Sequence, residues 1–270
     1  MLGGFFRPYE CLLDMTNHSP YFDHISKIRA IFFDLHHTLT KTRVDFQGLM
    51  REAAHVVGID ISHITNEQLK DAFARMNPWI LNYQIEKDVD IHWGTEPEQW
   101  IDVNREYLQN LGISNIIDQT LIEFEHAWKN ITKSNWESLI DDAKEVLEEL
   151  RRRDYVLGLC TRRHDDPQAL LERWSIRDLF ASIQWTAVPG YAKPSPYTLI
   201  QAAFETSINP RLCAYVGNTV DADVGAAINA EMLPILTTWA NPQEAILAPD
   251  KTIVIDSLNE LLEMFSGPIS

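Results

Sequence analysis

The fold of this chain is indicated most clearly by residues 30–38, which read AIFFDLHHT. The apolar run from Ala30 to Phe33 predicts a short buried strand. Asp34 then places a carboxylate directly at the C-terminal end of that strand. A fully apolar strand belongs inside a sheet, so the rest of the chain should supply its neighbours.

Alternating strand and helix patterns fill the chain from residue 140 onward. Short apolar runs predict strands over residues 155–160, 183–185, 214–216, 233–237 and 252–255. Helical spacing predicts helices over residues 141–153, 167–174, 196–204, 221–230 and 257–265. Repeated strand–helix units predict a doubly wound parallel-sheet α/β core, Rossmann-like, with helices on both faces. In such sheets the ligand lies beyond the carboxyl ends of the strands.

Residues 46–133 have a different pattern, with no convincing strand and several helix signals. Thr65 followed by Gln68 predicts a capping box at a helix start. Thr95 followed by Glu98 predicts a second one. We therefore predict that this segment is an all-helical cap domain.

These patterns divide the chain into three predicted parts. The α/β core domain comprises residues 29–45 and 134–270, and the helical cap domain comprises residues 46–133. Residues 1–28 form a polar N-terminal extension without the features of a signal peptide. One role open to this extension is to pack on a second subunit of a homo-oligomer.

The composition restricts the kinds of partner. The chain has 270 residues, with 23 Lys and Arg against 39 Asp and Glu, and a formal net charge of −16. So acidic a chain is unsuited to a nucleic-acid backbone or an anionic membrane surface, and we expect neither as a partner. No apolar run approaches the roughly 20 residues that span a bilayer. Cys11, Cys160 and Cys213 form neither a zinc spacing nor a disulfide framework, which favours a cytoplasmic location.

Polar groups stand where the predicted strands end. They are Asp34, Thr161, Lys193 and residues 217–223, which read GNTVDAD. Beyond the carboxyl ends of a parallel sheet these groups could converge on one ligand. An Asp can act as a nucleophile, a Thr can donate to a transferring oxygen, and a Lys can neutralise developing charge. Carboxylate and amide oxygens suit a hard cation such as Mg²⁺.

In this order the four sites resemble the motifs of the haloacid dehalogenase-like (HAD) hydrolase superfamily, in its subgroup with a helical cap inserted after the first motif. The first motif of the family, Asp-x-Asp-Gly-Thr, corresponds to residues 34–38. The second corresponds to Thr161 and the third to Lys193-Pro194. The fourth, Gly-Asp-Ser-x-x-x-Asp, corresponds to residues 217–223.

The resemblance implies a role for each matching residue. Asp34 would attack phosphorus and form an aspartyl-phosphate, while Thr161 and Lys193 would hold the phosphoryl oxygens. His36 stands where the phosphatases of the family have their acid/base Asp, and a histidine can do both jobs near neutral pH. Arg162 is a candidate for binding an anionic substrate through bidentate hydrogen bonds. We therefore expect a small phosphorylated metabolite as the substrate.

The resemblance also implies a Mg²⁺ site. Its ligands would be Asp34, the backbone carbonyl of His36, Asn218 and Asp223. Asn218 replaces the usual Asp, and because it offers an oxygen without a charge it should weaken Mg²⁺ binding. His37 replaces the usual Gly, so the backbone there is expected to differ.

The departures at His36 and Asn218 leave three readings open. The first is a phosphatase with a histidine acid/base and a weakened metal site. The second is a metal-independent 2-haloacid dehalogenase, since dehalogenases of this superfamily also lack the second Asp and use an Asn in the fourth motif, although they typically have Tyr at position 36. The third is a catalytically impaired domain that binds a ligand or partner. We adopt the first, because intact Asp34, Thr161 and Lys193 argue against the third reading and the absence of Tyr at position 36 argues against the second.

Overall fold

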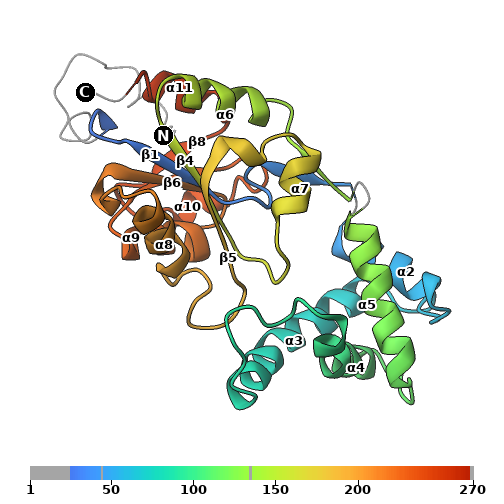
Figure 1. Ribbon diagram of the computed structural model, residues 1–270. Coiled ribbons are helices and arrows are strands. Elements are labelled where there is room, and N and C mark those ends of the chain that lie inside the picture. Colours follow the sequence, from blue (N-terminus) through green and yellow to red (C-terminus); the bar gives the residue numbers. More distant parts are fainter. Residues whose placement is uncertain (1–24, 44, 134–135, 268–270) are drawn as a thin grey trace, which may run out of the picture.

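The computed structural model describes residues 25–43, 45–133 and 136–267. Six parallel strands form one sheet in the order β5-β4-β1-β6-β7-β8 (Figure 1). They are β1 (Ala30–Phe33), β4 (Val156–Thr161), β5 (Phe180–Trp185), β6 (Cys213–Gly217), β7 (Leu233–Thr237) and β8 (Ile253–Ile255). The predicted parallel α/β core is confirmed, and β1 lies in its interior between β4 and β6.

The residues of β1 alternate between the two faces of this sheet. Ile31 and Phe33 belong to the hydrophobic cluster on one face, and Ala30 and Phe32 to the cluster on the other. The first face is covered by α6 (Ala143–Arg152), α7 (Gln168–Arg173) and α11 (Glu260–Met264), and the second by α8 (Tyr197–Glu205) and α9 (Gly225–Asn229). Because helices bury both faces, the strand is apolar at every position.

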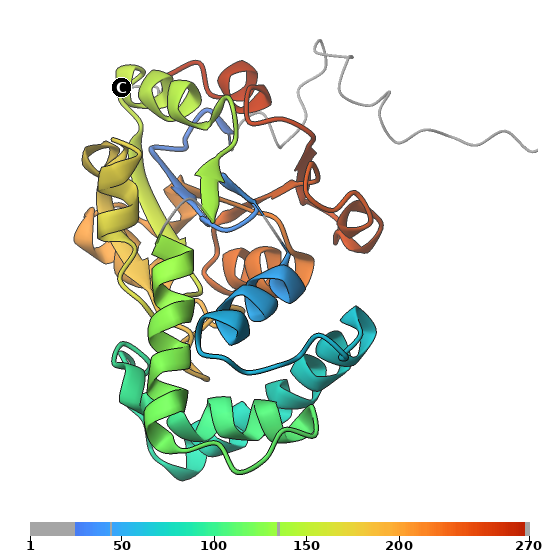
Figure 2. The same ribbon diagram turned by 90° about the vertical axis from the view of Figure 1, so that its right-hand side faces the viewer.

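A helical insert lies between β2 (Thr40–Thr42) and β3 (Glu137–Leu139), which pair antiparallel as a small second sheet. Its elements are α2 (Phe46–Val56), α3 (Asn66–Glu86), η2 (Pro97–Trp100), α4 (Ile101–Asn110) and α5 (Asp118–Lys133). They enclose a hydrophobic cluster of their own. Figures 1 and 2 show α3, α4 and α5 gathered at one end of the molecule, away from the six-stranded sheet. Within the described ranges, no helix has the length and apolar character needed to cross a bilayer.

Most elements begin and end within three residues of their predicted bounds, but two differ in kind. The predicted helix over residues 221–230 is divided into a π-helical turn, η5 (Val220–Val224), and α9. The β2–β3 pair was not predicted, because strands of three residues have no periodicity to recognise. Short helical elements in the connections are η3 (Arg177–Leu179), η4 (Pro210–Leu212) and α10 (Glu244–Leu247).

One of the two predicted capping boxes is confirmed at the start of α3. The other, at Thr95 and Glu98, is wrong by one residue. Gln99 Oε1 accepts from the backbone N–H of Glu96 at 3.0 Å. Pro97 occupies the first position of η2, so the residue before it becomes the N-cap.

Candidate active site

The candidate site lies at the carboxyl ends of β1, β4 and β6. Asp34 follows β1 directly, and its backbone N–H donates to the carbonyl of Val216 at 2.9 Å. Thr161 is the last residue of β4, and Gly217 is the last residue of β6. The parallel register therefore brings the first, second and fourth motifs to one edge of the sheet.

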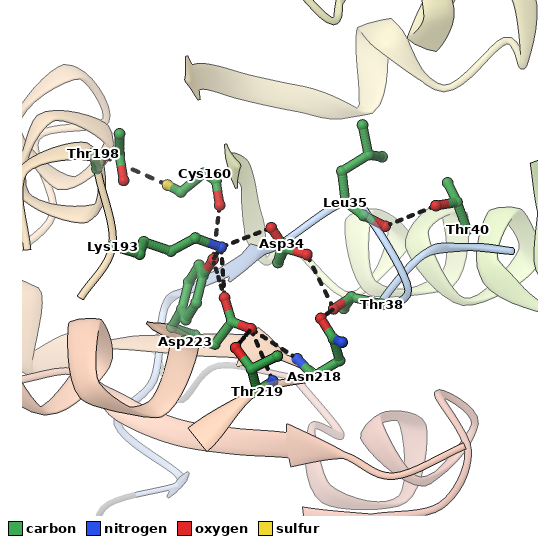
Figure 3. Close-up of polar contacts among 11 residues, drawn as sticks. Asp34, Leu35, Thr38, Thr40, Cys160, Lys193, Thr198, Asn218, Thr219 and Asp223 are labelled. Carbon is green, nitrogen blue, oxygen red and sulfur yellow. Dashed lines mark hydrogen bonds and ion pairs between the residues drawn. The ribbon is translucent and has the colours of Figure 1, made fainter. Parts of the chain in front are cut away.

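Lys193 joins two carboxylates at the centre of this edge (Figure 3). Its Nζ donates to Asp34 Oδ1 at 2.7 Å and to Asp223 Oδ1 at 2.5 Å. The third partner is the hydroxyl of Tyr215 at 2.8 Å. All four side chains are buried. Three acceptors match the three N–H groups of an ammonium, so the buried cation is fully hydrogen-bonded.

Burial and charge act in opposite directions on this ion pair. Burial alone would lower the pKa of Lys193, but the charges of Asp223 and Asp34 outweigh it and raise that pKa above its ordinary value. Burial raises the pKa of Asp34, and Lys193 partly offsets the rise. Lys193 is therefore an ammonium at neutral pH and favours the carboxylate form of Asp34.

Asp223 fixes the loop of the fourth motif. Its Oδ2 accepts from the backbone N–H groups of Asn218 at 3.0 Å and Thr219 at 2.9 Å, and from the Thr219 hydroxyl at 2.8 Å. Both oxygens of Asp223 are thus engaged, one by this loop and one by Lys193. Gly217 leaves room for this arrangement, because a Cβ there would lie only 2.3 Å from the Cβ of Asp223.

Thr38 links Asp34 to Asn218. Its hydroxyl lies 3.3 Å from Asp34 Oδ2 and 3.3 Å from Asn218 Oδ1, so the two oxygens face the same point. A carboxylate oxygen and an amide oxygen are both suitable ligands for a hard cation such as Mg²⁺, and Asp34 supplies the one carboxylate of this pair. In the described part of the chain, no group of three or more His, Cys, Asp or Glu side chains is arranged to hold a metal ion.

The hydroxyl of Thr161 is buried without a partner. The residue is 2% exposed, and among the described residues nothing hydrogen-bonds to its Oγ1. A buried hydroxyl without a partner costs free energy, on the order of 1–3 kcal/mol. Beside Asp34 at the strand ends, this unpaired hydroxyl marks a position where a ligand oxygen would be stabilised.

His36 lies in a second group of contacts. Its Nδ1 is 2.8 Å from Glu137 Oε1, and its ring stacks on Trp136 with centroids 5.3 Å apart. Glu137 also accepts from Thr40 at 2.5 Å and from Arg163 at 3.3 Å. Burial would raise the pKa of Glu137, but the bonds from His36 and Thr40 and the charge of Arg163 outweigh it and lower the pKa to about 2. Glu137 is therefore ionised at neutral pH.

The backbone between Asp34 and Thr38 turns through a left-handed residue. His37 has a φ of 60°, a conformation that favours glycine. A side chain in this region costs roughly 1 kcal/mol, which the surrounding contacts have to offset.

The two arginines after Thr161 have different environments. Arg163 pairs with Glu137 and, at 2.9 Å, with Asp165. Arg162 is exposed, and no hydrogen bond or ion pair of its side chain is found in the described ranges. The structure therefore leaves Arg162 open to an anion, while Arg163 is already paired.

The predicted site residues fall into two sets. One hydrogen-bonded network joins Asp34, Lys193, Asn218 and Asp223. Thr161 lies at the same edge of the sheet without a bond to that network, and His36 and Arg162 lie outside it.

Thr40, Tyr215, Trp136 and Glu137 take part in these contacts without having been predicted. Tyr215 lies within an apolar strand, where an aromatic residue indicates only core packing. Trp136 and Glu137 follow the helical insert, and neither belongs to one of the four motifs. Only the pairing of β2 with β3 brings them to His36.

Comparison with known proteins places this site in a family. Residues 28–231 match haloacid dehalogenase-like hydrolases. The chain is 21% identical to N-acylneuraminate-9-phosphatase of Homo sapiens over 250 residues, which cover 89% of this chain and 93% of that one. It shares 18% identity and a TM-score of 0.57 with a predicted phosphoglycolate phosphatase from Haemophilus somnus 129pt, over 88% of this chain and 98% of that one. It shares 18% identity and a TM-score of 0.59 with a 2-haloacid dehalogenase from Pseudomonas syringae pv. Tomato DC3000, over 88% of this chain and 98% of that one. Because the family match spans most of the chain, this protein belongs to the haloacid dehalogenase-like hydrolases.

Proposed function

We propose that this protein is a phosphatase that hydrolyses a small, anionic phosphorylated metabolite. The observation that carries the proposal is the buried Asp34 carboxylate, held by Lys193 beside the unpaired hydroxyl of Thr161. A nucleophile, a cation and a free donor at one strand edge are the groups that phosphoryl transfer requires. The similarity to N-acylneuraminate-9-phosphatase supports the same reaction class.

The reaction has two steps. In the first, an oxygen of Asp34 bonds to phosphorus while the bond from phosphorus to the leaving oxygen breaks, and His36 donates a proton to that oxygen. In the second, the oxygen of a water molecule bonds to phosphorus while the bond from phosphorus to the Asp34 oxygen breaks, His36 takes a proton from the water, and phosphate leaves. Thr161 donates to a phosphoryl oxygen throughout, the positive charge of Lys193 stabilises the phosphoryl oxygens, and Arg162 pairs with an anionic group on the substrate.

Mg²⁺ is the proposed cofactor, bound weakly. Asp34, Asn218 and the backbone carbonyl of His36 would hold it, and Asp223 would support the site by fixing its loop. When bound, the ion supplies positive charge that neutralises the phosphoryl oxygens. Because Asn218 carries no charge, the affinity should be lower than with a second carboxylate.

We also propose that the helical insert encloses the substrate. Residues 46–133 would act as a cap that closes over the core domain, residues 29–45 and 134–270, to exclude water during attack on phosphorus.

The proposed location of the protein is the cytoplasm, in keeping with the cysteine pattern. Neither a nucleic acid nor a membrane surface is expected as a partner of so acidic a chain, and a homo-oligomer is compatible with the N-terminal extension. Residues 1–24 of that extension lie outside the described residues.

A metal-independent 2-haloacid dehalogenase is the second candidate, and Asn218 is the residue that favours it. In that reaction Asp34 would attack carbon and displace a halide, which needs no protonation of the leaving group. His36 would then have no role as an acid. A binding protein without catalysis is the remaining alternative.

The first test is hydrolysis of an aryl phosphate with and without Mg²⁺. We expect Mg²⁺-stimulated turnover that falls at least about a thousandfold in Asp34→Asn, because the nucleophile is removed. Asp221→Asn, an exposed carboxylate four residues from Gly217, is the matched control and should keep its activity. Full activity in Asp34→Asn would exclude the mechanism. If no phosphate ester is hydrolysed, halide release from a 2-haloacid would separate the dehalogenase from the binding protein.

A further inference from the structure

The Glu137 carboxylate connects segments that are far apart in the sequence. It lies at the start of β3, where the chain returns from the helical insert, and the residue is 3% exposed. Thr40 in β2 donates to its Oε1, and Arg163 after β4 donates to its Oε2. These two partners fix the position of the carboxylate. The remaining contact of Glu137 is with Nδ1 of His36, 2.8 Å from Oε1.

The partners of Glu137 decide which nitrogen of His36 is free. Arg163 forms an ion pair with Oε2 of Glu137 at 3.3 Å, so this side chain is a carboxylate, which can only accept hydrogen bonds. Nδ1 of His36, 2.8 Å from Oε1, therefore has to carry the hydrogen. Nε2 is then the nitrogen left for a ligand. It carries a proton when the ring is cationic and a lone pair when the ring is neutral.

The plane of the His36 ring is fixed as well. Trp136 stacks on it with an interplanar angle of 19°, and the ring of His37 meets it edge-on with centroids 4.1 Å apart. In the part of the chain that the structure describes, Nε2 has no hydrogen-bond partner, and the His36 side chain is 36% exposed. The ring is therefore held on its Nδ1 side and open on its Nε2 side.

We infer that Glu137 is a positioning residue, which keeps Nδ1 of His36 protonated and leaves Nε2 open to the substrate. The inference rests on the proposed function in one respect, the role of His36 as acid and base. None of the four sequence motifs contains Glu137. It is the pairing of β2 with β3 that brings this residue to His36.

Both proton transfers depend on the hydrogen at Nδ1. In the first step the cationic ring loses its Nε2 proton to the leaving oxygen as the phosphorus–oxygen bond breaks. In the second step the neutral ring accepts a proton at Nε2 from the attacking water, so one cycle returns His36 to its starting state. Ionised Glu137 stabilises the cationic ring that is present before the first step and again after the second.

The variant Glu137→Gln tests this role. Arg163 can only donate, so the amide oxygen should turn toward it and the amide N–H₂ toward His36. Nδ1 then becomes an acceptor and the cationic ring is disfavoured. We expect kcat for an alkyl phosphate, whose leaving group needs a proton, to fall at least about tenfold. For a dinitrophenyl phosphate, whose leaving group needs none, the first step should change less than about threefold in a pre-steady-state burst.

Two controls distinguish a role of Glu137 in positioning His36 from a general loss of structure. Glu125→Gln alters another buried glutamate, which pairs with Asn104 inside the helical insert, and should leave both esters unaffected. In a His36→Ala background, Glu137→Gln should cost no further activity, because its effect acts through His36. Equal losses with both esters, or independent losses in the double variant, would overturn the inference.

A measurement without turnover keeps this test separate from the proposed function. In the wild-type protein, ¹⁵N NMR of the His36 imidazole should show a proton on Nδ1 in both its neutral and cationic forms. In Glu137→Gln that proton should move to Nε2 of the neutral ring. A wild-type Nδ1 without a proton would refute the inference even if the protein is a phosphatase. A protonated Nδ1 in a protein that hydrolyses no phosphate ester would refute only the proposed function.

Discussion

Asn218 sets the charge of the network around Lys193. Lys193 carries one positive charge, and Asp34 and Asp223 carry one negative charge each. Hydrogen bonds can stabilise one buried cation together with two buried anions, without a bound metal ion. An aspartate at position 218 would add a third negative charge 3.3 Å from the hydroxyl that also contacts Asp34. The asparagine therefore makes the network less dependent on a bound cation.

Asn218→Asp should strengthen Mg²⁺ binding and lower the thermal stability of the metal-free protein. We expect a lower melting temperature than wild type in EDTA, because like charges repel in a partly buried site. The rise in melting temperature on adding Mg²⁺ should be larger than in wild type, because a second carboxylate becomes available. Thermal unfolding with and without Mg²⁺ measures both effects. Asn241→Asp, at an exposed position, is the charge-matched control. Equal Mg²⁺ responses in Asn218→Asp and wild type would show that position 218 is not a ligand.

The segment between α3 and η2 docks the helical insert onto the core domain. His164, after β4, lies with Nδ1 3.1 Å from the carbonyl of Trp93, and its ring meets the rings of Trp93 and Trp100 edge-on. Nearby, the Thr186 hydroxyl donates to the carbonyl of Ile91 at 2.9 Å. These contacts attach the insert to the core domain at a place other than the two crossings of the chain.

His164→Ala should release this docked segment. The substitution removes a hydrogen bond and two ring contacts, which together are worth on the order of 1–3 kcal/mol. Hydrogen exchange in residues 90–100 should therefore accelerate about tenfold or more, while exchange in β1 and β4 stays unchanged. His63→Ala, at an exposed position of the insert, is the control. Unchanged exchange in residues 90–100 would mean that the segment is held by other contacts.

The described residues form three hydrophobic clusters, two on the faces of the sheet and one in the insert, and His164 bonds the insert to the chain after β4. Val188 of the core domain packs into the cluster of the insert. Burial lowers the pKa of His164 to about 4, so the folded protein favours its neutral form. Glu137, with its pKa of about 2, favours the charged form. Both groups bind protons more readily in the unfolded chain, so both destabilise the fold as the pH falls.

The free energy of unfolding should therefore decrease in two stages on acidification. Lowering the pH from about 6.5 to 4 protonates His164 in the unfolded chain first and costs up to about 3 kcal/mol. Below about 4.5 the Glu137 contribution is lost in the same way, down to its folded pKa of about 2. Urea unfolding across this range measures the decline. In His164→Gln the free energy of unfolding should depend less steeply on pH between 6.5 and 4 than in the wild-type protein. An unchanged slope would assign the decline to other groups.

The sequence by itself determined the fold class and most of the Asp34 network. Buried strands need apolar runs, so strands such as Ala30–Phe33 and Leu233–Thr237 could be recognised locally. The motif order then placed Asp34, Lys193 and Asp223 near one another, because parallel strands end at the same edge of the sheet.

Only the tertiary structure decided how His36 is held. Thr40 and Glu137 are 97 residues apart in the chain, and three-residue strands have no local signal that predicts their pairing. The hydrogen bond from Lys193 to Tyr215 depends likewise on how the loop between β5 and α8 meets β6. Hydrogen bonds and ion pairs form between groups that are close in space, and for such distant segments closeness is determined by the packing of the whole chain.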